Sequence, residues 1–467
     1  GGIYDHLGGG FHRYSTDAQW LVPHFEKMLY DQALLSRTYL ERYRVTRRDD
    51  FAATARGIFE YVLRDLTAPE GAFYSAEDAE SAVDAKKPEE KEEGAFYVWT
   101  KTEIDKLLSA EEASVFNFHY GVKQSGNVIS DPHQEFVGEN ILYVAHSAEE
   151  AAKKFNLPSD KVTSLLLSAR EKLFAARERR PRPHLDDKVL VSWNGLMISA
   201  LARAYQVLGD VRYRDAAERA AQFVMTRMYN EKKKLLRRYR DGEARYEAHL
   251  EDYAFITQGL LDLYEASLDI RWLKTAIDFT GQEKELFYDA ERGGFYDTSG
   301  KDKSILTRTK ESYDGAEPTG NSIAILNLLR LSQMTDNKEW RAMADKSLEY
   351  FGSQMLNAPQ ALPQFLVALD FSLAKPKQII IAGQASDKHT QELLQEVHAR
   401  FIPNKIILLA DNGTGQRTLA SYMPFIETIQ MLDGMPTAYI CENYTCQLPT
   451  SDVKTVASLL DNTRKTK

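Results

Sequence analysis

The sequence has few cysteines and no long apolar run. Only Cys441 and Cys446 occur among its 467 residues, too few for a secreted scaffold held together by disulfides. Their C-x4-C spacing differs from the C-x-x-C of a zinc ribbon, and we expect two reduced thiols near the end of a strand. No stretch approaches the roughly 18 apolar residues that cross a bilayer, and no signal segment opens the chain. These absences predict a cytoplasmic protein with no membrane partner. The first residue is Gly1 rather than Met, so we expect a truncated chain that can lack an upstream targeting segment.

An excess of positive charge is also missing. Lys and Arg number 59 against 68 Asp and Glu, a net charge of −9, which argues against a surface for nucleic acid or for anionic membranes. At 43% hydrophobic and 27% charged residues, the composition is that of a globular protein. One basic cluster can be read as a phosphate or nucleic-acid contact, or as the solvated edge of a hairpin guarded by charges, and we favour the second reading. It consists of Lys232, Lys233, Lys234, Arg237, Arg238 and Arg240.

Short glycine–aromatic segments recur along the chain. The pattern Gly, then Gly or Ala, then Phe, then His or Tyr occurs four times, at 9–12, 71–74, 94–97 and 293–296. Because glycine permits a tight turn and aromatic residues suit a pleated surface, each copy predicts one strand of a short hairpin. Asp241-Gly242 predicts a further hairpin from Leu235 to Tyr246. The acidic and lysine-rich run Glu80 to Glu93 interrupts the hairpin of the two middle copies, and we expect a solvated loop there, with a gating lid as the alternative.

Between these segments lie helical patterns that come in pairs. Apolar residues spaced by threes and fours, as in Leu196, Leu201 and Leu208, mark a buried face. Turn and cap residues such as Gly209-Asp210 and Asp336-Asn337 connect the partners. Because paired helices bury their faces only by stacking on the next pair, the pattern predicts a curved or closed α/α toroid. The predicted helices span 25–43, 51–66, 193–208, 213–228, 253–268, 273–286, 322–334 and 340–355.

The pattern changes at residue 375. A strand over 378–382, a helix over 387–400 and a strand over 405–410 predict a βαβ unit with a parallel sheet, and 437–441 predicts a third strand. Neither G-x-G-x-x-G nor G-x-x-x-x-G-K occurs in this segment, so no nucleotide cofactor is expected. The predicted domains are a helical toroid over residues 1–374 and a small α/β domain over 375–467.

Polar residues cluster before the predicted inner helices. His24-Phe25-Glu26 and His249-Leu250-Glu251 share one spacing, and Asp252 follows the second. If the inner helices run parallel in a closed array, their N-termini, whose N–H groups favour carboxylates and hydroxyl-rich ligands, meet at one shared mouth. A His beside a Glu can exchange protons near neutral pH, so we assign catalytic roles to His24, Glu26, His249, Glu251 and Asp252. The alternative is that these acids are ordinary helix caps.

Aromatic residues lie beside these charges. Sugar rings have apolar faces and hydroxyl rims, so aromatic walls with carboxylates and amides suit a carbohydrate as the small-molecule partner, with Trp193 stacking on a ring. No metal site is expected, because the spacing of His6, His12 and His24 fits no common zinc pattern. The residues that we expect to contact a substrate are His12, Tyr30, Asp31, Glu77, Asp78, Asp187, Trp193, Asn194, Tyr253, Glu317 and Asn321.

Several long motifs resemble one family. They are GGIYDHLGGGFHRYS from Gly1, VPHFEKMLYD from Val22, DDK from Asp186 with SWNGL from Ser192, and CENYTC from Cys441. These segments resemble the spermatogenesis-associated, thioredoxin-domain-containing family over nearly the whole chain. The resemblance implies a thioredoxin-like N-terminal part, missing here, and a mainly α fold: an (α/α)6-type toroid of helix pairs with short β-hairpins, followed by the small α/β segment. The implied toroid, truncated at its N-terminus, is similar to six-hairpin glycosidases and to N-acylglucosamine and cellobiose 2-epimerases.

The predicted function is that of a carbohydrate-active protein, either a sugar epimerase or isomerase or a glycoside hydrolase, with its pocket at the toroid mouth. The alternative is a non-catalytic scaffold that binds a ligand or partner for the thioredoxin-like domain. A redox role is the third option, and it requires the Cα atoms of Cys441 and Cys446 to lie within ~7 Å. The sequence leaves the substrate and the oligomeric state open.

Overall fold

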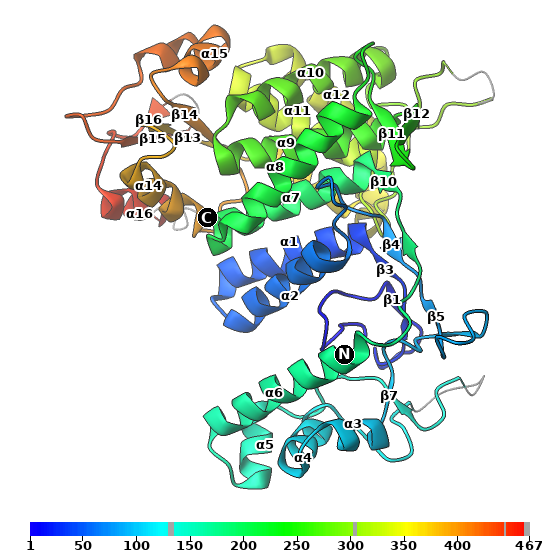
Figure 1. Ribbon diagram of the computed structural model, residues 1–467. Coiled ribbons are helices and arrows are strands. Elements are labelled where there is room, and N and C mark those ends of the chain that lie inside the picture. Colours follow the sequence, from blue (N-terminus) through cyan, green and yellow to red (C-terminus); the bar gives the residue numbers. More distant parts are fainter. Residues whose placement is uncertain (129–134, 302–305, 443–444, 462–467) are drawn as a thin grey trace. The chain divides into compact units, whose positions relative to one another are not determined.

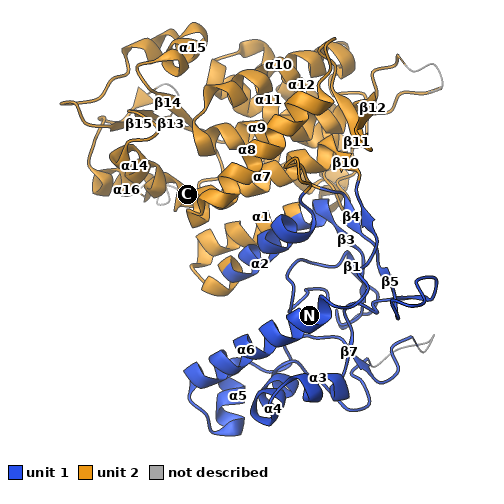
Figure 2. Cartoon of the chain, viewed as in Figure 1, with its two compact units in different colours: residues 1–32, 53–67, 74–187 blue, residues 33–52, 68–73, 188–467 orange. Residues whose placement is uncertain are grey.

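The computed structural model describes residues 1–128, 135–301, 306–442 and 445–461. The chain forms two compact units (Figure 2). The first comprises residues 1–32, 53–67 and 74–187, and the second comprises 33–52, 68–73 and 188–467. The predicted domain boundary at residue 375 falls inside the second unit and stays a prediction.

Consecutive helix pairs build much of the second unit (Figure 1). The first helix of each pair packs against the first helix of the next, and the second helix of each pair packs on its own partner. This arrangement confirms the predicted fold class, mainly α with helix pairs of the α/α toroid type. The pairs are α7 (Val191–Leu208) with α8 (Val211–Phe223), α9 (Leu250–Ser267) with α10 (Ile270–Phe287), and α11 (Gly320–Thr335) with α12 (Lys338–Asn357).

Local capping residues separate the partners of a pair, as the sequence predicts. Gly209 ends α7 in the left-handed region at φ 73°, and the Asp210 side chain accepts the N–H of Arg212 in the first turn of α8. Asp336 and Asn337 do the same between α11 and α12. Each connection is short, so the two helices of a pair run antiparallel.

The predicted hairpin around Asp241-Gly242 is confirmed. β11 (Leu236–Arg240) pairs antiparallel with β12 (Glu243–Glu247), and both turn residues have positive φ. β10 (Val189–Leu190) adds a third strand beside β11.

The glycine–aromatic copies give a mixed outcome. Bridges from Tyr4 to Phe11 and from Tyr288 to Phe295 confirm the hairpins at the first and fourth copies. The third copy is different, because the carbonyl of Gly94 accepts from two following N–H groups and makes a turn. The loop predicted for 80–93 contains a hairpin of its own, formed by β5 (Glu80–Ala82) and β6 (Lys91–Glu93).

The first unit also contains a helical subdomain that the sequence analysis missed. Its helices bury one apolar cluster, which includes Trp99, Phe116 and Leu173. They are α3 (Lys101–Leu107), α4 (Ala110–His119), α5 (Ala148–Phe155) and α6 (Ser159–Arg177).

The chain up to residue 77 also forms short strands and two helices. A short sheet joins β3 (Lys27–Met28), β4 (Ala76–Glu77) and β9 (Leu185–Asp186), and β1 (Tyr14–Ser15) pairs with β2 (Pro23–His24). The helices α1 and α2 span Leu29–Thr46 and Asp49–Asp65. In the described part of the chain, no helix combines the length and the apolar character needed to cross a membrane.

The C-terminal segment of the second unit is the predicted α/β element. β13 (Lys377–Ala382) and β14 (Lys405–Ala410) are parallel and joined through α14 (Lys388–His398), while β15 (Thr437–Glu442) runs antiparallel on the other side of β13. The strand order is β14-β13-β15-β16, with β16 (Thr445–Cys446) at the edge. Besides α14, the α-helices that follow α12 in the described chain are α13 (Pro363–Leu373), α15 (Thr414–Tyr422) and α16 (Val453–Asp461).

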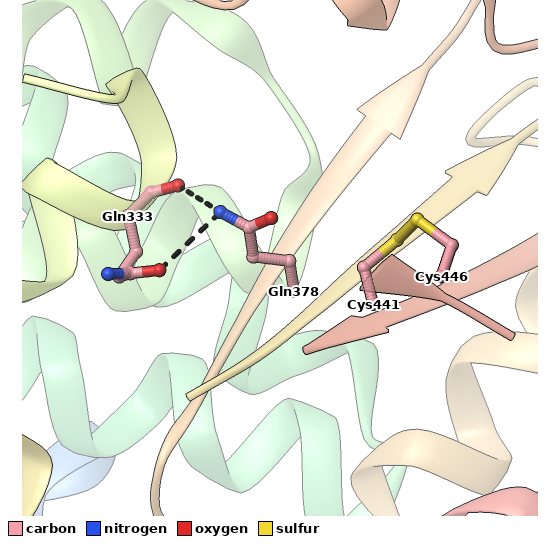
Figure 3. Close-up of a disulfide and its surroundings, with 4 residues drawn as sticks. All are labelled: Gln333, Gln378, Cys441 and Cys446. Atoms are coloured by element: carbon pink, nitrogen blue, oxygen red, sulfur yellow. Dashed lines mark hydrogen bonds between the residues drawn. A yellow bond between two sulfur atoms is a disulfide. The ribbon is translucent and has the colours of Figure 1, made fainter. Parts of the chain in front are cut away.

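A disulfide joins the last two strands (Figure 3). Cys441 and Cys446 lie directly opposite each other on β15 and β16, with Cα atoms 3.8 Å apart. The expectation of two reduced thiols is therefore wrong for this structure, because the hairpin register brings the side chains together. Asn443 and Tyr444 of the CENYTC motif lie outside the described residues. Gln378, paired with Cys441 in the sheet, donates from Nε2 to the Gln333 carbonyl at 2.9 Å.

Candidate active site

A cavity of about 360 Å³ lies in the second unit where α9 and α11 begin. Two sequence-distant helix starts therefore meet, as the toroid prediction requires for these two helices. The structure brings three of the predicted site residues together here, His249, Glu251 and Glu317. The cavity is lined by His249, Leu250, Glu251, Asp297, Glu311, Tyr313, Gly315, Glu317, Pro318, Thr319 and Gly320.

Glu317 is a half-buried acid in this cavity. Burial, and then repulsion from Glu251, raise its pKa to about 7. The Trp193 indole N–H donates to Oε2 at 2.7 Å, and this bond favours the ionised form, which limits the rise. Glu317 therefore changes protonation near neutral pH, which is the property of a general acid. The sequence analysis assigned both residues only to substrate contact.

Arg237 of β11 holds the two acids that open α9. Its Nη2 donates to Glu251 Oε1 at 2.6 Å, and its Nη1 donates to Asp252 Oδ2 at 2.9 Å. Asp252 is fully buried and also accepts the backbone N–H groups of His249 and Ser192. Burial raises the pKa of Asp252, and Arg237 opposes the rise. Both oxygens of Asp252 are occupied, as the alternative interpretation of a helix cap expects, while Glu251 stays in the cavity wall.

Two further acids of the cavity were missed. Thr309 Oγ1 donates to Asp297 at 2.7 Å, and the backbone N–H of Glu311 donates to both Asp297 oxygens. Burial raises the pKa of Asp297. Its position directly after the fourth glycine–aromatic copy is a signal that could have identified it. Among the described residues, no three His, Cys, Asp or Glu side chains are grouped to hold a metal ion.

The two amides predicted to contact substrate, Asn194 and Asn321, each bind a backbone segment, and their substrate role stays a prediction. Asn321 Oδ1 accepts the Phe295 N–H at 2.8 Å, and Nδ2 donates to the Phe295 carbonyl at 2.9 Å. In each of three such pairs the amide lies in the first turn of a helix and the phenylalanine lies in a glycine–aromatic copy. The amides therefore hold the hairpins in place. One of the three amides, Gln32, was not identified by the sequence analysis. The equivalent pairs are Asn194 with Phe73, at 2.9 Å for both bonds, and Gln32 with Phe11, at 2.8 Å for both.

In the first unit, His24 lies between two glutamates. Its Nδ1 is 2.8 Å from Glu93 Oε1, and its Nε2 is 3.6 Å from Glu26 Oε2. Arg13 donates to Glu26 at 2.9 Å. His24 and Glu26 are close enough to exchange a proton through small movements, and Glu93 was missed. His24 belongs to the first unit and His249 to the second, so the shared mouth stays a prediction.

A buried ion network also lies in the first unit. Asp5 binds Lys27 Nζ at 2.9 Å and both terminal nitrogens of Arg177 at 2.8 Å. Burial raises the pKa of Asp5, but Arg177 and Lys27 together hold it well below its usual range. Glu77, predicted to contact substrate, accepts the Tyr61 hydroxyl at 2.7 Å, and burial raises its pKa.

His12 and Tyr30 are both buried within the first unit. Burial, and then the charge of Lys27, lower the pKa of His12 to about 3, so the ring is neutral. Its Nδ1 lies 2.9 Å from the Phe25 carbonyl. The Tyr30 hydroxyl accepts from Arg13 at 3.1 Å. These contacts hold both side chains in place, and their predicted contact with substrate stays a prediction.

Among the other predicted contacts, Tyr253 belongs to the second unit and Asp31, Asp78 and Asp187 belong to the first. Tyr253 is buried, and its hydroxyl binds Gln282 at 3.3 Å, which places it in the packing between α9 and α10. Asp31 and Asp187 are half-buried, and Asp78 is exposed. A substrate role for these three acids stays a prediction.

By fold the chain is a protein of α/α helix pairs with a small α/β segment. No family model matches it. It is 41% identical over 481 residues to spermatogenesis-associated protein 20 of Homo sapiens, in an alignment that covers 98% of this chain and 61% of that protein. The chain thus spans about three-fifths of the length of this relative. The resemblance to the spermatogenesis-associated family predicted from the motifs is confirmed.

Solved structures of similar fold include sugar epimerases and glycoside hydrolases. The cellobiose 2-epimerase from Bacillus thermoamylovorans has a TM-score of 0.38 at 10% identity, covering 79% of this chain and 66% of that chain. A glycoside hydrolase family 76 mannosidase from Bacteroides thetaiotaomicron has a TM-score of 0.39 at 10% identity, covering 75% and 67%. At TM-scores below 0.5, neither likeness supports a conclusion about this chain's activity.

Proposed function

We propose that the chain is an enzyme that acts on a carbohydrate by general acid–base catalysis in the cavity at the starts of α9 and α11. The observation that carries the proposal is Glu317, an acid with a pKa of about 7 in the same cavity as the ion-paired Glu251. A carboxyl group that holds its proton near neutral pH can serve as the acid, and a second carboxyl group in the same cavity that is ion-paired to arginine can serve as the base.

Each group has a distinct part. The Trp193 N–H donates to Oε2 of Glu317, so Oε1 is the oxygen that carries the proton. From there the proton passes to a glycosidic or carbonyl oxygen of the substrate. Glu251, which Arg237 holds in place, is the carboxylate that accepts a proton or stabilises positive charge. His249 lines the cavity and is the second proton carrier.

The cavity wall favours a neutral, hydroxyl-rich ligand. Its volume of about 360 Å³ falls within the roughly 300–1,000 Å³ of small-molecule pockets. Glu251, Asp297, Glu311 and Glu317 offer many acceptors for hydroxyl donors, whereas an anionic ligand would be repelled. Tyr313 is 64% exposed and supplies an aromatic face for a sugar ring.

Proton NMR in D2O tests the proposal with D-mannose, N-acetylglucosamine and cellobiose as probes. Epimerase-type chemistry exchanges the hydrogen on the carbon beside the carbonyl for deuterium, while hydrolysis creates new anomeric signals. We expect turnover that falls by about 10²–10⁴-fold in Glu317→Gln, because the amide cannot donate an acidic proton.

Glu349→Gln is the matched control, because Glu349 is an exposed acid on α12. Equal turnover in Glu317→Gln and the wild-type chain would overturn the assignment. Absence of turnover for every sugar, together with saturable sugar binding, would instead support the non-catalytic scaffold.

A further inference from the structure

A second group of charges lies in the second unit, toward the C-terminal ends of α7, α9 and α11. At its centre is Asp262, which is buried at 1% exposure. It accepts from Arg203 Nε and Nη2 at 3.1 Å, from Arg330 Nη2 at 2.8 Å and from Ser199 Oγ at 2.5 Å. The hydrogen-bonding positions of its carboxylate are therefore taken up by these donors.

More cations surround this centre than acids. Among the described residues that are buried or half-buried in this cluster, five are cations and three are carboxylates, and the exposed Arg47 adds a positive charge beside Arg44. Arg37 of α1 donates to the neutral amide of Gln258 at 3.2 Å rather than to a carboxylate. Arg44 donates to the carbonyl of Arg400. The cations are Arg37, Arg44, Arg203, Arg330 and Lys405, and the carboxylates are Glu41, Asp262 and Glu265.

Burial and the neighbouring cations both lower the pKa values of several basic groups in this cluster. Burial, and then the charge of Arg44, lower the pKa of Lys405 to about 7. Burial, and then Arg203, lower the pKa of Arg37 to about 10. His398 beside them has a pKa well below its ordinary value, because of burial and the charges of Lys405 and Arg44. These groups respond to one another, so they form a single electrostatic cluster.

The cluster also contains donors without acceptors. Arg330 is 4% exposed, and its Nη1 has no hydrogen-bond partner among the described residues. The same is true of Arg44 Nε. A guanidinium stays charged in a protein, so it cannot relieve this situation by losing a proton. A buried charged donor without an acceptor is costly, and native proteins satisfy such groups with a partner or a ligand.

We propose that this arginine cluster binds a small inorganic anion, which accepts from Arg330 Nη1 and balances the charge of Arg37, Arg44 and Lys405. Chloride and phosphate share the required chemistry of a small acceptor with negative charge. The site is separate from the acidic cavity, which repels anions, and it does not depend on the proposed enzymatic activity.

Thermal unfolding of the chain tests this proposal. Sodium gluconate, whose anion is bulky, is replaced stepwise by chloride or by phosphate at constant ionic strength. We expect a saturable rise of about 2–5 °C in the melting temperature with the anion that fits, because a ligand that binds the folded state stabilises it. A rise with chloride alone identifies a halide site, and a rise with phosphate alone identifies an oxyanion site.

Variants distinguish this site from a general salt effect. Arg37→Gln removes a cation without a carboxylate partner, so it should melt higher than the wild-type chain in gluconate and lose the anion response. Arg56→Gln removes an exposed cation from α2 and should keep the response. Isothermal titration calorimetry of the wild-type chain with chloride and with phosphate measures the heat of anion binding directly and requires no variant. The proposal is overturned if neither anion gives heat or a saturable rise, or if Arg37→Gln melts lower in gluconate.

Discussion

At the scale of single residues, environment decides which carboxyl groups hold a proton. Glu317 and Asp262 are both removed from water, yet their pKa values move in opposite directions. Glu317 faces another acid, Glu251, and receives one neutral indole donor. Asp262 faces Arg203 and Arg330, and their charges outweigh its burial. Burial raises the pKa of a carboxyl group only where nearby positive charges do not outweigh it, and they outweigh it at Asp262 but not at Glu317.

Trp193→Phe tests how the indole controls this acid. The N–H donor favours the ionised carboxylate, so its loss should raise the pKa of Glu317 above about 7. The side-chain carboxyl carbon of Glu317, followed by carbon NMR against pH, measures the shift without any substrate. Trp272→Phe is the matched control, since its indole N–H has no partner among the described residues. An unchanged or lower pKa in Trp193→Phe would refute the positioning role.

At the scale of elements, two glycines decide how closely α7 and α9 approach. A Cβ atom added at Gly259 would lie 2.6 Å from the carbonyl oxygen of Gly195, and one added at Gly195 would lie 2.5 Å from the backbone of α9. Contacts with backbone cannot be relieved by rotating a side chain. The close approach lets Ser199 and Arg203 of α7 reach Asp262 of α9. The SWNGL motif therefore carries a packing requirement as well as Trp193.

Gly259→Ala measures this requirement. The new methyl group would force the two helices apart, and we expect a loss of about 1–3 kcal/mol in the free energy of unfolding. Gly281→Ala on α10 is the control, because its Cβ would meet no atom within 4 Å. That substitution should stabilise the chain by roughly 0.5–1 kcal/mol through helix propensity. Urea unfolding followed by circular dichroism gives both values, and equal effects of the two substitutions would contradict the close-packing account.

At the scale of the whole molecule, the sequence predicted what local patterns determine. The eight expected helices are present because their apolar spacing, their caps such as Asp210 and their turn residues such as Gly209 act over a few residues. Among the missed helices from 101 to 177, α3 and α5 are short and each buries a single residue, Ile104 and Ala151, whereas α6 is as long as the predicted helices. Their stability comes from packing on one another, which no single segment reveals.

The candidate site was harder to predict for the same reason. The bond from Trp193 to Glu317 joins residues 124 positions apart, and the pKa of Glu317 depends on that contact and on Glu251. The sequence identified these residues as polar or aromatic groups at helix starts but could not assign the proton donor. Asn194 and Asn321 are also polar residues at helix starts, but their amides bind backbone groups of a neighbouring hairpin. The sequence alone does not distinguish these two uses of a polar side chain.

One buried acid makes the stability of the molecule depend on pH. Glu283 of α10 is 1% exposed, and its Oε2 has no hydrogen-bond partner among the described residues. Burial alone raises its pKa to about 8. Between the ordinary value of 4.5 and about 8, the unfolded chain has released this proton and the folded chain still holds it. The folded state binds more protons in this window, so the free energy of unfolding falls as the pH rises through it, and the loss is complete above about 8.

Glu283→Gln should remove this dependence, because an amide does not titrate. We expect the wild-type chain to lose about 3–5 kcal/mol between pH 5 and pH 8.5 from this group, and the variant to lose correspondingly less. Urea unfolding at a series of pH values gives the slopes, and Glu349→Gln, an exposed acid on α12, should retain the wild-type slope. Glu317 also makes the free energy of unfolding fall with pH, and it does so equally in all three chains. The difference in slope between the wild-type chain and Glu283→Gln therefore measures the contribution of Glu283. If the free energy of unfolding changes with pH equally in the wild-type chain and in Glu283→Gln, then Glu283 ionises in the folded protein with its ordinary pKa. Its surroundings would then admit water.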